Sequence, residues 1–274
     1  MNAPFNPDAL PQWRLDDLYA GREDPKIAAD LAAARSAAED LAKLEGKLTE
    51  ARADAARLGG LLDEGIRLYE RGANLLGAIG AYAALAASTA RDDPAWAKFE
   101  GDLRARSAEI ASLALFFTLE INKLEDAELE AALDAFPKAA VWRPWLRRVR
   151  LSRPHELSPE LERMLLDRSP AVANWVRLYD ETLARLTAKA GRETLTLPEA
   201  LNRLSDPLPE RRKQAAQGLA KALAERTPVL ALALNTLAFE KQVEDRWRRY
   251  PSPAASRHIA NEVDADAVEA LVAA

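Results

Sequence analysis

The chain has 274 residues and a formal net charge of −5, and 49% of its residues are hydrophobic while 30% are charged. This composition is typical of a globular protein, and the acidic balance gives no general attraction to nucleic acid or anionic lipid. Because the sequence contains no cysteine, it excludes disulfides, iron–sulfur clusters, thiol nucleophiles and cysteine-ligated zinc. The first residues lack a basic region followed by an apolar run, so we expect a cytoplasmic protein.

The apolar residues predict an all-α fold. Alanine and leucine dominate them, and both are strong helix formers because they lose little side-chain entropy in a helix. The longest apolar stretch, residues 73–90, is mostly Ala and Gly and includes Asn74 and Ser88. We therefore expect this stretch to be a buried helix of a soluble protein and not a membrane span.

Residues 1–23 are predicted to form an extended arm, because Pro4, Pro7 and Pro11 block helix formation. Its apolar residues are expected to dock on the body of the protein: Trp13, Leu15, Leu18 and Tyr19.

Residues 24–110 are predicted to form a hairpin of long antiparallel helices. The first helix runs from about Asp24, an N-cap followed by proline, to Gly46. The second covers residues 49–90 and is weakened near residues 59–60, and a third begins at Asp93. Three glycines of the second helix are expected to permit close approach of a neighbouring helix: Gly72, Gly77 and Gly80.

Residues 111–190 are predicted to form a helical lobe. Helix starts are indicated by the pairs Ser158–Pro159 and Ser169–Pro170. Short β-type runs on both sides of Gly191 predict one small hairpin in an otherwise helical chain.

Residues 191–274 are predicted to contain helices over 199–204, 209–223 and 228–247. The last of these is expected to turn four apolar residues inward: Leu230, Leu234, Leu237 and Val243. The segment from Asp264 to Ala274 starts an amphipathic helix and carries no C-terminal stop signal. We therefore expect an uncovered apolar face at Val268, Leu271 and Val272, possible self-association, and a chain that is the front part of a longer protein.

The usual catalytic motifs are incomplete in this sequence. His155 and Glu156 match the first half of an HExxH zinc helix, but the segment RPHELSP reads as a turn and the second histidine does not follow. His258 has Glu262 four residues on, which an exposed His–carboxylate pair explains better than a metal site. Two glycine pairs have Walker spacing without the phosphate-binding lysine: Gly60 with Gly65, and Gly72 with Gly77. We therefore nominate no catalytic, cofactor-binding or metal-binding residue.

One basic segment, residues 142–153, reads WRPWLRRVRLSR. Interleaved Trp and Arg could stack bases and hold phosphates. The stronger interpretation is a connector whose tryptophans, Trp142 and Trp145, anchor it to the core while its arginines pair with surplus carboxylates.

Several sequence segments, taken in their order along the chain, resemble the N-terminal portion of bacterial oligoendopeptidase F-type zinc metallopeptidases, which are relatives of thimet oligopeptidase. These segments are PQWRLDDLYAG, YAALAASTARDDPAW, EIASLALFFTLEINKL and PHELSPELERMLLDRSPAVANWVRLYDETL. The resemblance continues over the last 65 residues, with seven residues at the places characteristic of the family: Asn235, Lys241, Arg249, Tyr250, Ser252, Asn261 and Val263.

The resemblance implies an incomplete helical peptidase shell around a channel in which short peptides are hydrolysed. It also implies that residues 191–274 are the start of the peptidase domain, before the zinc motif. In the family, zinc is held by the two histidines of HExxH and a further Glu; no residue of this chain corresponds to them. We therefore expect this chain alone to bind no zinc and to be inactive. The alternative is a free-standing helical module that binds a partner through its apolar face, without catalysis.

Overall fold

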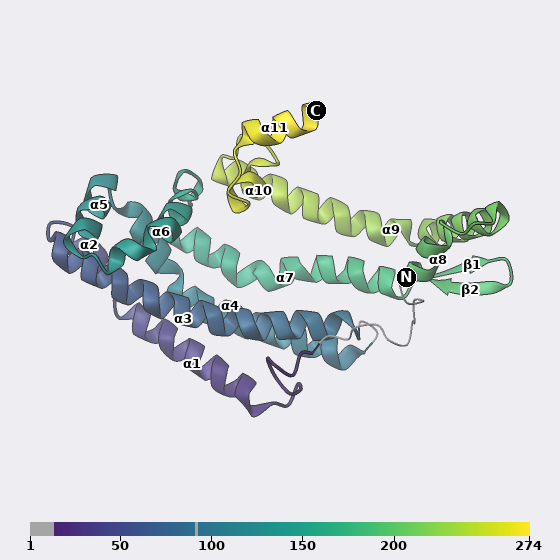
Figure 1. Cartoon of the computed structure of the whole chain (residues 1–274), viewed down its shortest axis with the longest axis horizontal. Helices are drawn as coiled ribbons and strands as arrows, with labels where there is room; N and C mark the ends of the chain where they lie inside the picture. Colours follow the sequence, from purple (N-terminus) through teal and green to yellow (C-terminus); the bar gives the residue numbers. More distant parts are fainter. Residues whose placement is uncertain (1–13, 91–92) are drawn as a thin grey trace, which may run out of the picture.

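The computed structural model describes residues 14–90 and 93–274, and shows an elongated helical molecule with one two-stranded sheet (Figure 1). The predicted all-α fold with a hairpin is confirmed. The expectations about Pro4, Pro7, Pro11 and Trp13 concern residues outside this described part. The α-helices are α1 (Pro25–Ala42), α2 (Lys47–Glu50), α3 (Ala55–Ser88), α4 (Pro94–Lys123), α5 (Asp126–Ala135), α6 (Arg143–Arg150), α7 (Pro159–Ala184), α8 (Leu197–Arg203), α9 (Pro209–Arg248), α10 (Ala255–Ala260) and α11 (Ala265–Ala273). Two 3-10 helices, η2 (Ala139–Trp142) and η3 (Arg153–His155), and two strands, β1 (Thr187–Ala190) and β2 (Glu193–Thr196), complete the set.

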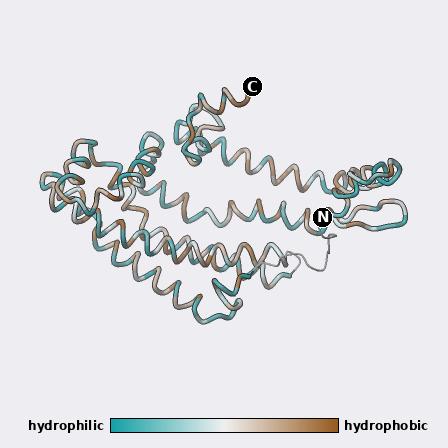
Figure 2. The backbone as a smooth tube through the Cα atoms, in the orientation of Figure 1, coloured by the Kyte–Doolittle hydropathy of each residue, from teal (hydrophilic) through white to brown (hydrophobic). Residues whose placement is uncertain are grey.

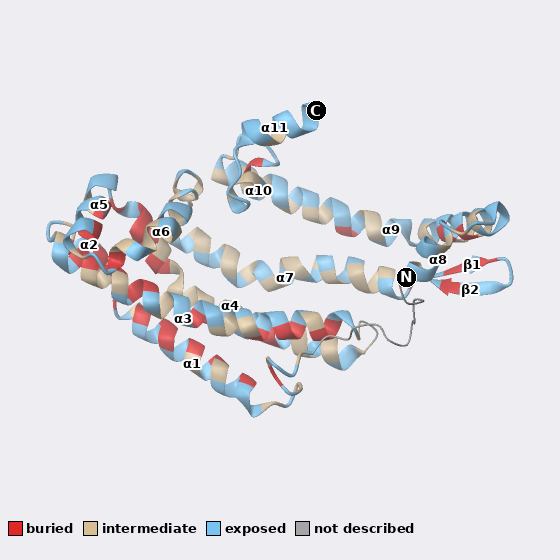
Figure 3. Cartoon of the chain, viewed as in Figure 1, coloured by how far each residue is buried: buried red, intermediate tan, exposed pale blue. Residues whose placement is uncertain are grey.

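The helices α1, α3 and α4 form a bundle that holds most of the buried residues (Figure 3). Its core has two parts. The Tyr82 cluster contains Tyr19, Ile27, Leu31, Ala34, Ala38, Ile79, Tyr82, Ala83, Ala86, Leu103 and Ile110. The Phe117 cluster lies nearer to α5 and α6 and includes Leu41, Leu48, Leu58, Leu62, Ile66, Phe117, Ile121, Leu124, Leu133 and Leu146.

Local sequence signals explain where the bundle helices begin. Asp24 accepts a hydrogen bond from the backbone N–H of Lys26, and Asp93 accepts one from that of Ala95; each precedes a proline at the first helical position. These side chains satisfy backbone donors that the first turn leaves unpaired. Tyr19 docks on the bundle, with its hydroxyl donating to Asp30 at 2.8 Å, so the described end of the arm packs as predicted.

Two glycines of α3 permit close helix contacts. A Cβ at Gly59 would lie 2.5 Å from the carbonyl oxygen of Ala132, and one at Gly65 would lie 2.4 Å from the ring of Phe117. The sequence predicted close helix contacts at other glycines of this helix, and that prediction is wrong. A Cβ at Gly77, for example, would meet nothing within 4 Å. The expected weakening of the helix near residues 59–60 is also wrong: α3 is continuous there because its neighbours pack against the glycine face.

The predicted hairpin pairs β1 with β2 in antiparallel register, with Ala190 opposite Glu193 and Gly191 in the turn at a φ of 65°. A Cβ at Gly218 of α9 would lie only 2.1 Å from the carbonyl oxygen of Lys189. The glycine therefore lets α9 cross directly over β1. A small hairpin cluster forms there from Leu186, Ala188, Ala190, Leu195, Ala200 and Leu219.

The helices α7 and α9 run alongside each other and differ from the prediction in length. Each is continuous through a proline, Pro170 in α7 and Pro228 in α9, where the sequence predicted new starts. An interior proline costs about 3 kcal/mol. Packing of α7 on α4, and of α9 on β1, α8 and α7, holds the turns on both sides in place.

Hydrophobic residues alternate with hydrophilic ones along both helices (Figure 2). No residue of α7, which is described throughout, is buried. The described residues of α9 include three buried ones, Ala215, Leu219 and Ala233. The expected inward position of Leu234 is wrong, because this residue is 64% exposed.

Candidate functional site

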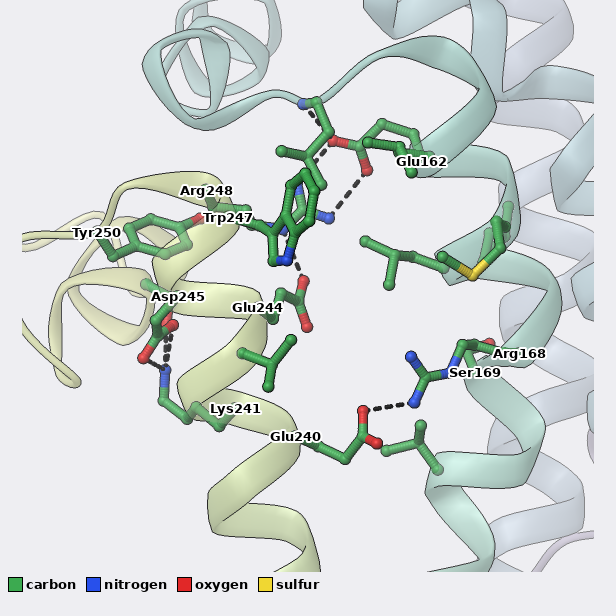
Figure 4. Close-up of a pocket in the computed structure, with 18 of the residues that line it drawn as sticks. Glu162, Arg168, Ser169, Glu240, Lys241, Glu244, Asp245, Trp247, Arg248 and Tyr250 are labelled. Carbon is green, nitrogen blue, oxygen red and sulfur yellow. Dashed lines mark hydrogen bonds and ion pairs between the residues drawn. The ribbon is translucent and has the colours of Figure 1, made fainter.

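A groove with a volume of about 1060 Å³ lies between α7 and α9 (Figure 4). Its α7 wall carries Leu161, Leu165, Val172 and Val176, which recur at helical spacing on one face. The α9 wall adds Leu237, Val243 and Trp247. These apolar side chains line the groove, and none of them is fully buried: Val176 and Trp247 are exposed and the others are partly buried.

Ion pairs join the two walls across the groove. Arg168 of α7 donates to Glu240 of α9 at 2.5 Å, and Arg248 of α9 donates to both oxygens of Glu162 of α7, at 2.6 and 2.9 Å (Figure 4). Arg248 also contacts Glu244 on its own helix at 2.6 Å. The charged groups therefore neutralise one another and set the spacing of the two walls.

The Arg248–Glu162 pair is largely removed from water, with side chains 16% and 11% exposed. Burial raises the pKa of Glu162, but hydrogen bonds from Arg248 and from the backbone N–H of Leu157 outweigh it, so this pKa lies below its usual value. The same contact with Glu162 raises the pKa of Arg248. Both groups are held in their charged forms.

Tyr250 lines the groove near the end of α9, and His155 packs against it from outside the groove. The Nδ1 of His155 lies 2.9 Å from the carbonyl oxygen of Arg248, so this nitrogen carries the proton and donates it. The Nη1 of Arg248 donates in return to the carbonyl oxygen of His155, and the His155 ring stacks on Tyr250 with centroids 4.1 Å apart. His155 thus joins η3 to the end of α9. The segment around it is the short 3-10 helix η3 followed by irregular residues, and not the α-helix that a zinc motif requires.

A polar network around the buried Asn122 lies next to His155, between α4 and the segment that precedes α7. Asn122 of α4 donates to Glu156, and also to the carbonyl oxygen of Val149 at 3.2 Å. Burial raises the pKa of Glu156 despite the hydrogen bond from Asn122. The network fastens the turn that precedes α7 to the bundle, so the α7 wall is positioned by the bundle core.

The C-terminal end of α9 is also connected to α10. Lys241 donates to both carboxylate oxygens of Asp245 at 2.8 Å and to the hydroxyl of Ser256 at 3.0 Å. Arg249 adopts a left-handed conformation, with a φ of 58°, and ends α9 so that the chain turns back toward α10. The sequence singled out Lys241, Arg249 and Tyr250, and the structure places all three in this corner.

The basic segment 142–153 is a connector, as the stronger interpretation predicted. The indole N–H of Trp142 donates to Asp63 at 3.1 Å, and the ring of Trp145 lies 5.5 Å from that of Tyr69. Four of the arginines lie within 4 Å of carboxylates: Arg143 with Glu130 and Asp134, Arg148 with Glu262, Arg150 with Asp126, and Arg153 with Glu125 and Asp126. The segment is therefore bound to the body of the molecule by both residue types.

The other motif fragments do not form sites in the described residues. His258 lies in α10, but Glu262 lies beyond the end of that helix with a φ of 52°, so the two do not share a helical face. The Walker-spaced glycines lie inside the continuous helix α3 and not in a loop.

A zinc ligand set is not formed by the residues present. Over residues 14–90 and 93–274, no three His, Asp or Glu side chains gather in a way that could hold a metal ion. The Nδ1 of His155 is engaged by a carbonyl oxygen, which leaves only one ring nitrogen on this residue. Within the same ranges, no helix is long and apolar enough to cross a membrane.

Comparisons with known proteins agree with the resemblance drawn from the sequence. A family model described as Oligopeptidase F matches residues 120–187, from the end of α4 to the start of β1. The crystal structure of oligoendopeptidase-F from Enterococcus faecium matches with a TM-score of 0.73 and 16% sequence identity. No curated protein matches the sequence. The structural match covers 88% of this chain and 47% of the enterococcal one, so the chain spans about half the length of that protein. Its fold is that of the N-terminal portion of an oligoendopeptidase F.

Proposed function

We propose that this chain is the N-terminal helical part of an oligoendopeptidase F-type zinc metallopeptidase, a cytoplasmic hydrolase of short peptides. One observation carries the proposal: the Oligopeptidase F match over residues 120–187 coincides with the residues that build the α7 wall and its attachment to the bundle. The agreement in fold over 88% of the chain supports the same conclusion.

The groove between α7 and α9 forms part of the wall of the peptide channel in this proposal. Its volume of about 1060 Å³ is at the upper end of the range for small-molecule sites, and a short extended peptide fits such a space. Apolar walls suit the apolar side chains of a peptide. A folded protein would be too thick to enter.

Zinc supplies the activated water in the proposed complete enzyme. The residues of this chain shape access to the channel and do not provide metal ligands or a general base. In this proposal residues 1–23 are an arm, 24–110 the long-helix region, 111–190 the helical lobe and 191–274 the start of the peptidase domain. We accordingly propose that the 274-residue chain has no peptidase activity by itself.

An alternative function is that of a partner-binding module without catalysis. The observation that favours it is the exposure of large apolar side chains at Phe239, Leu271 and Val272, at 64%, 77% and 81%. Such residues are common in protein-binding surfaces.

The proposal is tested on the protein from its source cells. An antibody against residues 14–274 precipitates the protein, and the precipitate is incubated with a quenched fluorescent peptide of about ten residues and with a folded protein of similar charge. We expect hydrolysis of the peptide alone, abolished by a zinc chelator and restored by zinc. A precipitate that contains the chain and hydrolyses neither substrate would favour the partner-binding module.

The inactivity of the isolated chain needs a separate measurement. The purified 274-residue chain is incubated with the same peptide and added zinc, beside the precipitate as a positive control. We expect no turnover, because activating water requires both a lowered pKa of the nucleophile and stabilisation of the developing charge. Chelator-sensitive turnover by the purified chain would overturn this part of the proposal and leave the family assignment intact.

A further inference from the structure

A second cavity lies in the bundle, at the boundary between its two core clusters, and is partly open to solvent beside the exposed Ala73. It has a volume of about 260 Å³ and is lined by residues of α1, α3, α4 and α7. Ala34, Ala38 and Ile110 on its wall belong to the Tyr82 cluster, whereas Leu41, Tyr69 and Ala114 belong to or pack on the Phe117 cluster. The two clusters therefore leave a space where they meet. For the remainder of this section this space is called the bundle cavity.

Small residues create the bundle cavity. At the level where the two clusters meet, α1 presents Ala34 and Ala38, α3 presents Gly72, and α4 presents Ala111 and Ala114. A Cβ at Gly72 would meet only the carbonyl oxygen of Ala34 at 3.8 Å and the Cβ of Ala37 at 4.0 Å, so a larger residue would fit there. Glycine in a helix interior is less favourable than alanine by up to about 1 kcal/mol. The close packing seen at Gly59 and Gly65 does not apply at Gly72, which leaves space instead.

The chemistry of the lining is almost entirely apolar. No charged residue lines the bundle cavity among the described residues, and the polar side chains at its wall are those of Tyr69 and Thr118. The hydroxyl of Thr118 already donates to the carbonyl oxygen of Leu115 at 3.2 Å, so its oxygen can accept hydrogen bonds but has no further proton to donate. An ordered water needs two to four polar partners, so this lining holds water poorly.

We propose that the bundle cavity is a binding site for a small uncharged molecule that is mainly apolar, such as a single aromatic ring with one polar substituent. An engineered apolar cavity of about 150 Å³ binds benzene, so a space of about 260 Å³ accommodates a ligand of roughly ten heavy atoms. Leu115 and Leu166 line both this cavity and the groove between α7 and α9.

Toluene and benzoate are the probes for this proposal, because they share a ring and differ in charge. Binding to the purified chain is followed by ligand-observed NMR and by the melting temperature. We expect saturable binding of toluene with a rise in melting temperature, since a ligand that binds only the folded state stabilises it. Benzoate should give neither signal. Absence of saturable toluene binding to the folded chain would overturn the proposal.

Variants show whether the probe is in the bundle cavity. Ala114→Leu and Ala111→Leu place side chains in the space and should weaken toluene binding at least tenfold, whereas Ala32→Leu, at an exposed position of α1, should leave it unchanged. Val172→Thr alters the groove alone. Binding that responds to Val172→Thr but not to the two leucine variants would overturn the proposal.

A milder pair of variants keeps the test decisive if the leucine variants do not fold. Gly72→Ala and Gly77→Ala make the same gain in helix propensity on the same helix, but only Gly72 lines the bundle cavity. We expect both to fold and only Gly72→Ala to weaken toluene binding, by about threefold. Equal affinities in the two variants would contradict a site at this place.

Discussion

The bundle of α1, α3 and α4 and the pair formed by α7 and α9 use apolar residues in different ways. In the bundle, residues such as Leu62 and Phe117 are completely buried, and glycines bring the helices into contact. Along α7 no residue is buried, and apolar side chains of both helices line a groove. Paired charges, and not a shared core, join the two walls. The comparison indicates that the bundle core provides most of the stability of the molecule. The two long helices α7 and α9 form the groove, and the bundle holds them in place.

The largest expected effect is in the bundle core. Phe117→Ala removes a fully buried ring that packs on Tyr69 and on Gly65. We expect the free energy of unfolding to fall by about 3–5 kcal/mol, measured by urea denaturation. A loss below about 1 kcal/mol would mean that the bundle is not the stable part of the molecule.

The next effect concerns the ion pair that joins the groove walls. Glu162→Gln replaces a charge-assisted double hydrogen bond to Arg248, and we expect a loss of about 1.5–3 kcal/mol at neutral pH. Because the folded-state pKa of Glu162 lies below its unfolded value, this contribution is present above the unfolded pKa and is lost as the pH falls through the folded pKa. The stability difference between wild type and variant should therefore shrink on acidification. A constant difference would contradict the assigned charge state.

The crossing of α9 over the hairpin should be sensitive to a single methyl group. Gly218→Ala places a Cβ 2.1 Å from the backbone oxygen of Lys189, and we expect a loss of about 1–3 kcal/mol because α9 and β1 must separate. Gly77→Ala is the matched control, since its Cβ meets nothing within 4 Å, and it should stabilise by about 0.5–1 kcal/mol. Equal changes in melting temperature would contradict the close approach.

A buried carboxylate in the bundle should behave oppositely to Glu162. Burial raises the pKa of Glu120, although the backbone N–H of Gly46 donates to it. The folded state then binds its proton more tightly than the unfolded state, so stability is highest below the unfolded pKa and declines as the pH rises through the folded pKa. Glu120→Gln should therefore stabilise at pH 7 by about 1 kcal/mol. This gain should disappear below about pH 4, as measured by thermal melting across pH.

The smallest effect is expected on the outer face of α9. Phe239→Ala is the same chemical change as Phe117→Ala at a side chain that is 64% exposed. We expect the free energy of unfolding to change by less than about 0.5 kcal/mol. A loss comparable to that of Phe117→Ala would show that the purified chain buries this face, for example by self-association, which light scattering would detect.

Helix starts and the hairpin could be predicted because their signals are local. Asp24 and Asp93 cap the helices that they precede, and Gly191 provides the positive φ of the turn. The pair Ser169–Pro170 and the proline at 228 led to wrong predictions of helix starts. The same local pattern also occurs inside a longer helix when packing against distant parts of the chain keeps that helix continuous. The close contacts of Gly59 and Gly65 depend on Ala132 and Phe117, more than 50 residues away, and no local pattern indicates them.

The candidate site was only partly visible in the sequence. Lys241, Arg249 and Tyr250 were identified through the family resemblance, and Trp142 and Trp145 through their spacing among arginines. Glu162 and Arg248, which join the groove walls, were not selected, because a sequence with 43 acidic and 38 basic residues offers many possible pairs. The i,i+4 spacing of Glu244 and Arg248 was the one available signal, and it indicates a helix-surface pair and not the contact with α7.

The sequence by itself determined the helical class, the hairpin and the resemblance to the N-terminal portion of an oligoendopeptidase F. The helical class follows from residue propensities, the hairpin from short-range turn signals, and the resemblance from the order of several sequence segments along the chain. Only the tertiary structure decided that α7 and α9 border a groove, that Glu162 meets Arg248 across it, and that two core clusters leave a cavity where they meet. Those features depend on which surfaces come together over long sequence separations, and periodicity shows that a helix face is apolar without showing what the face contacts.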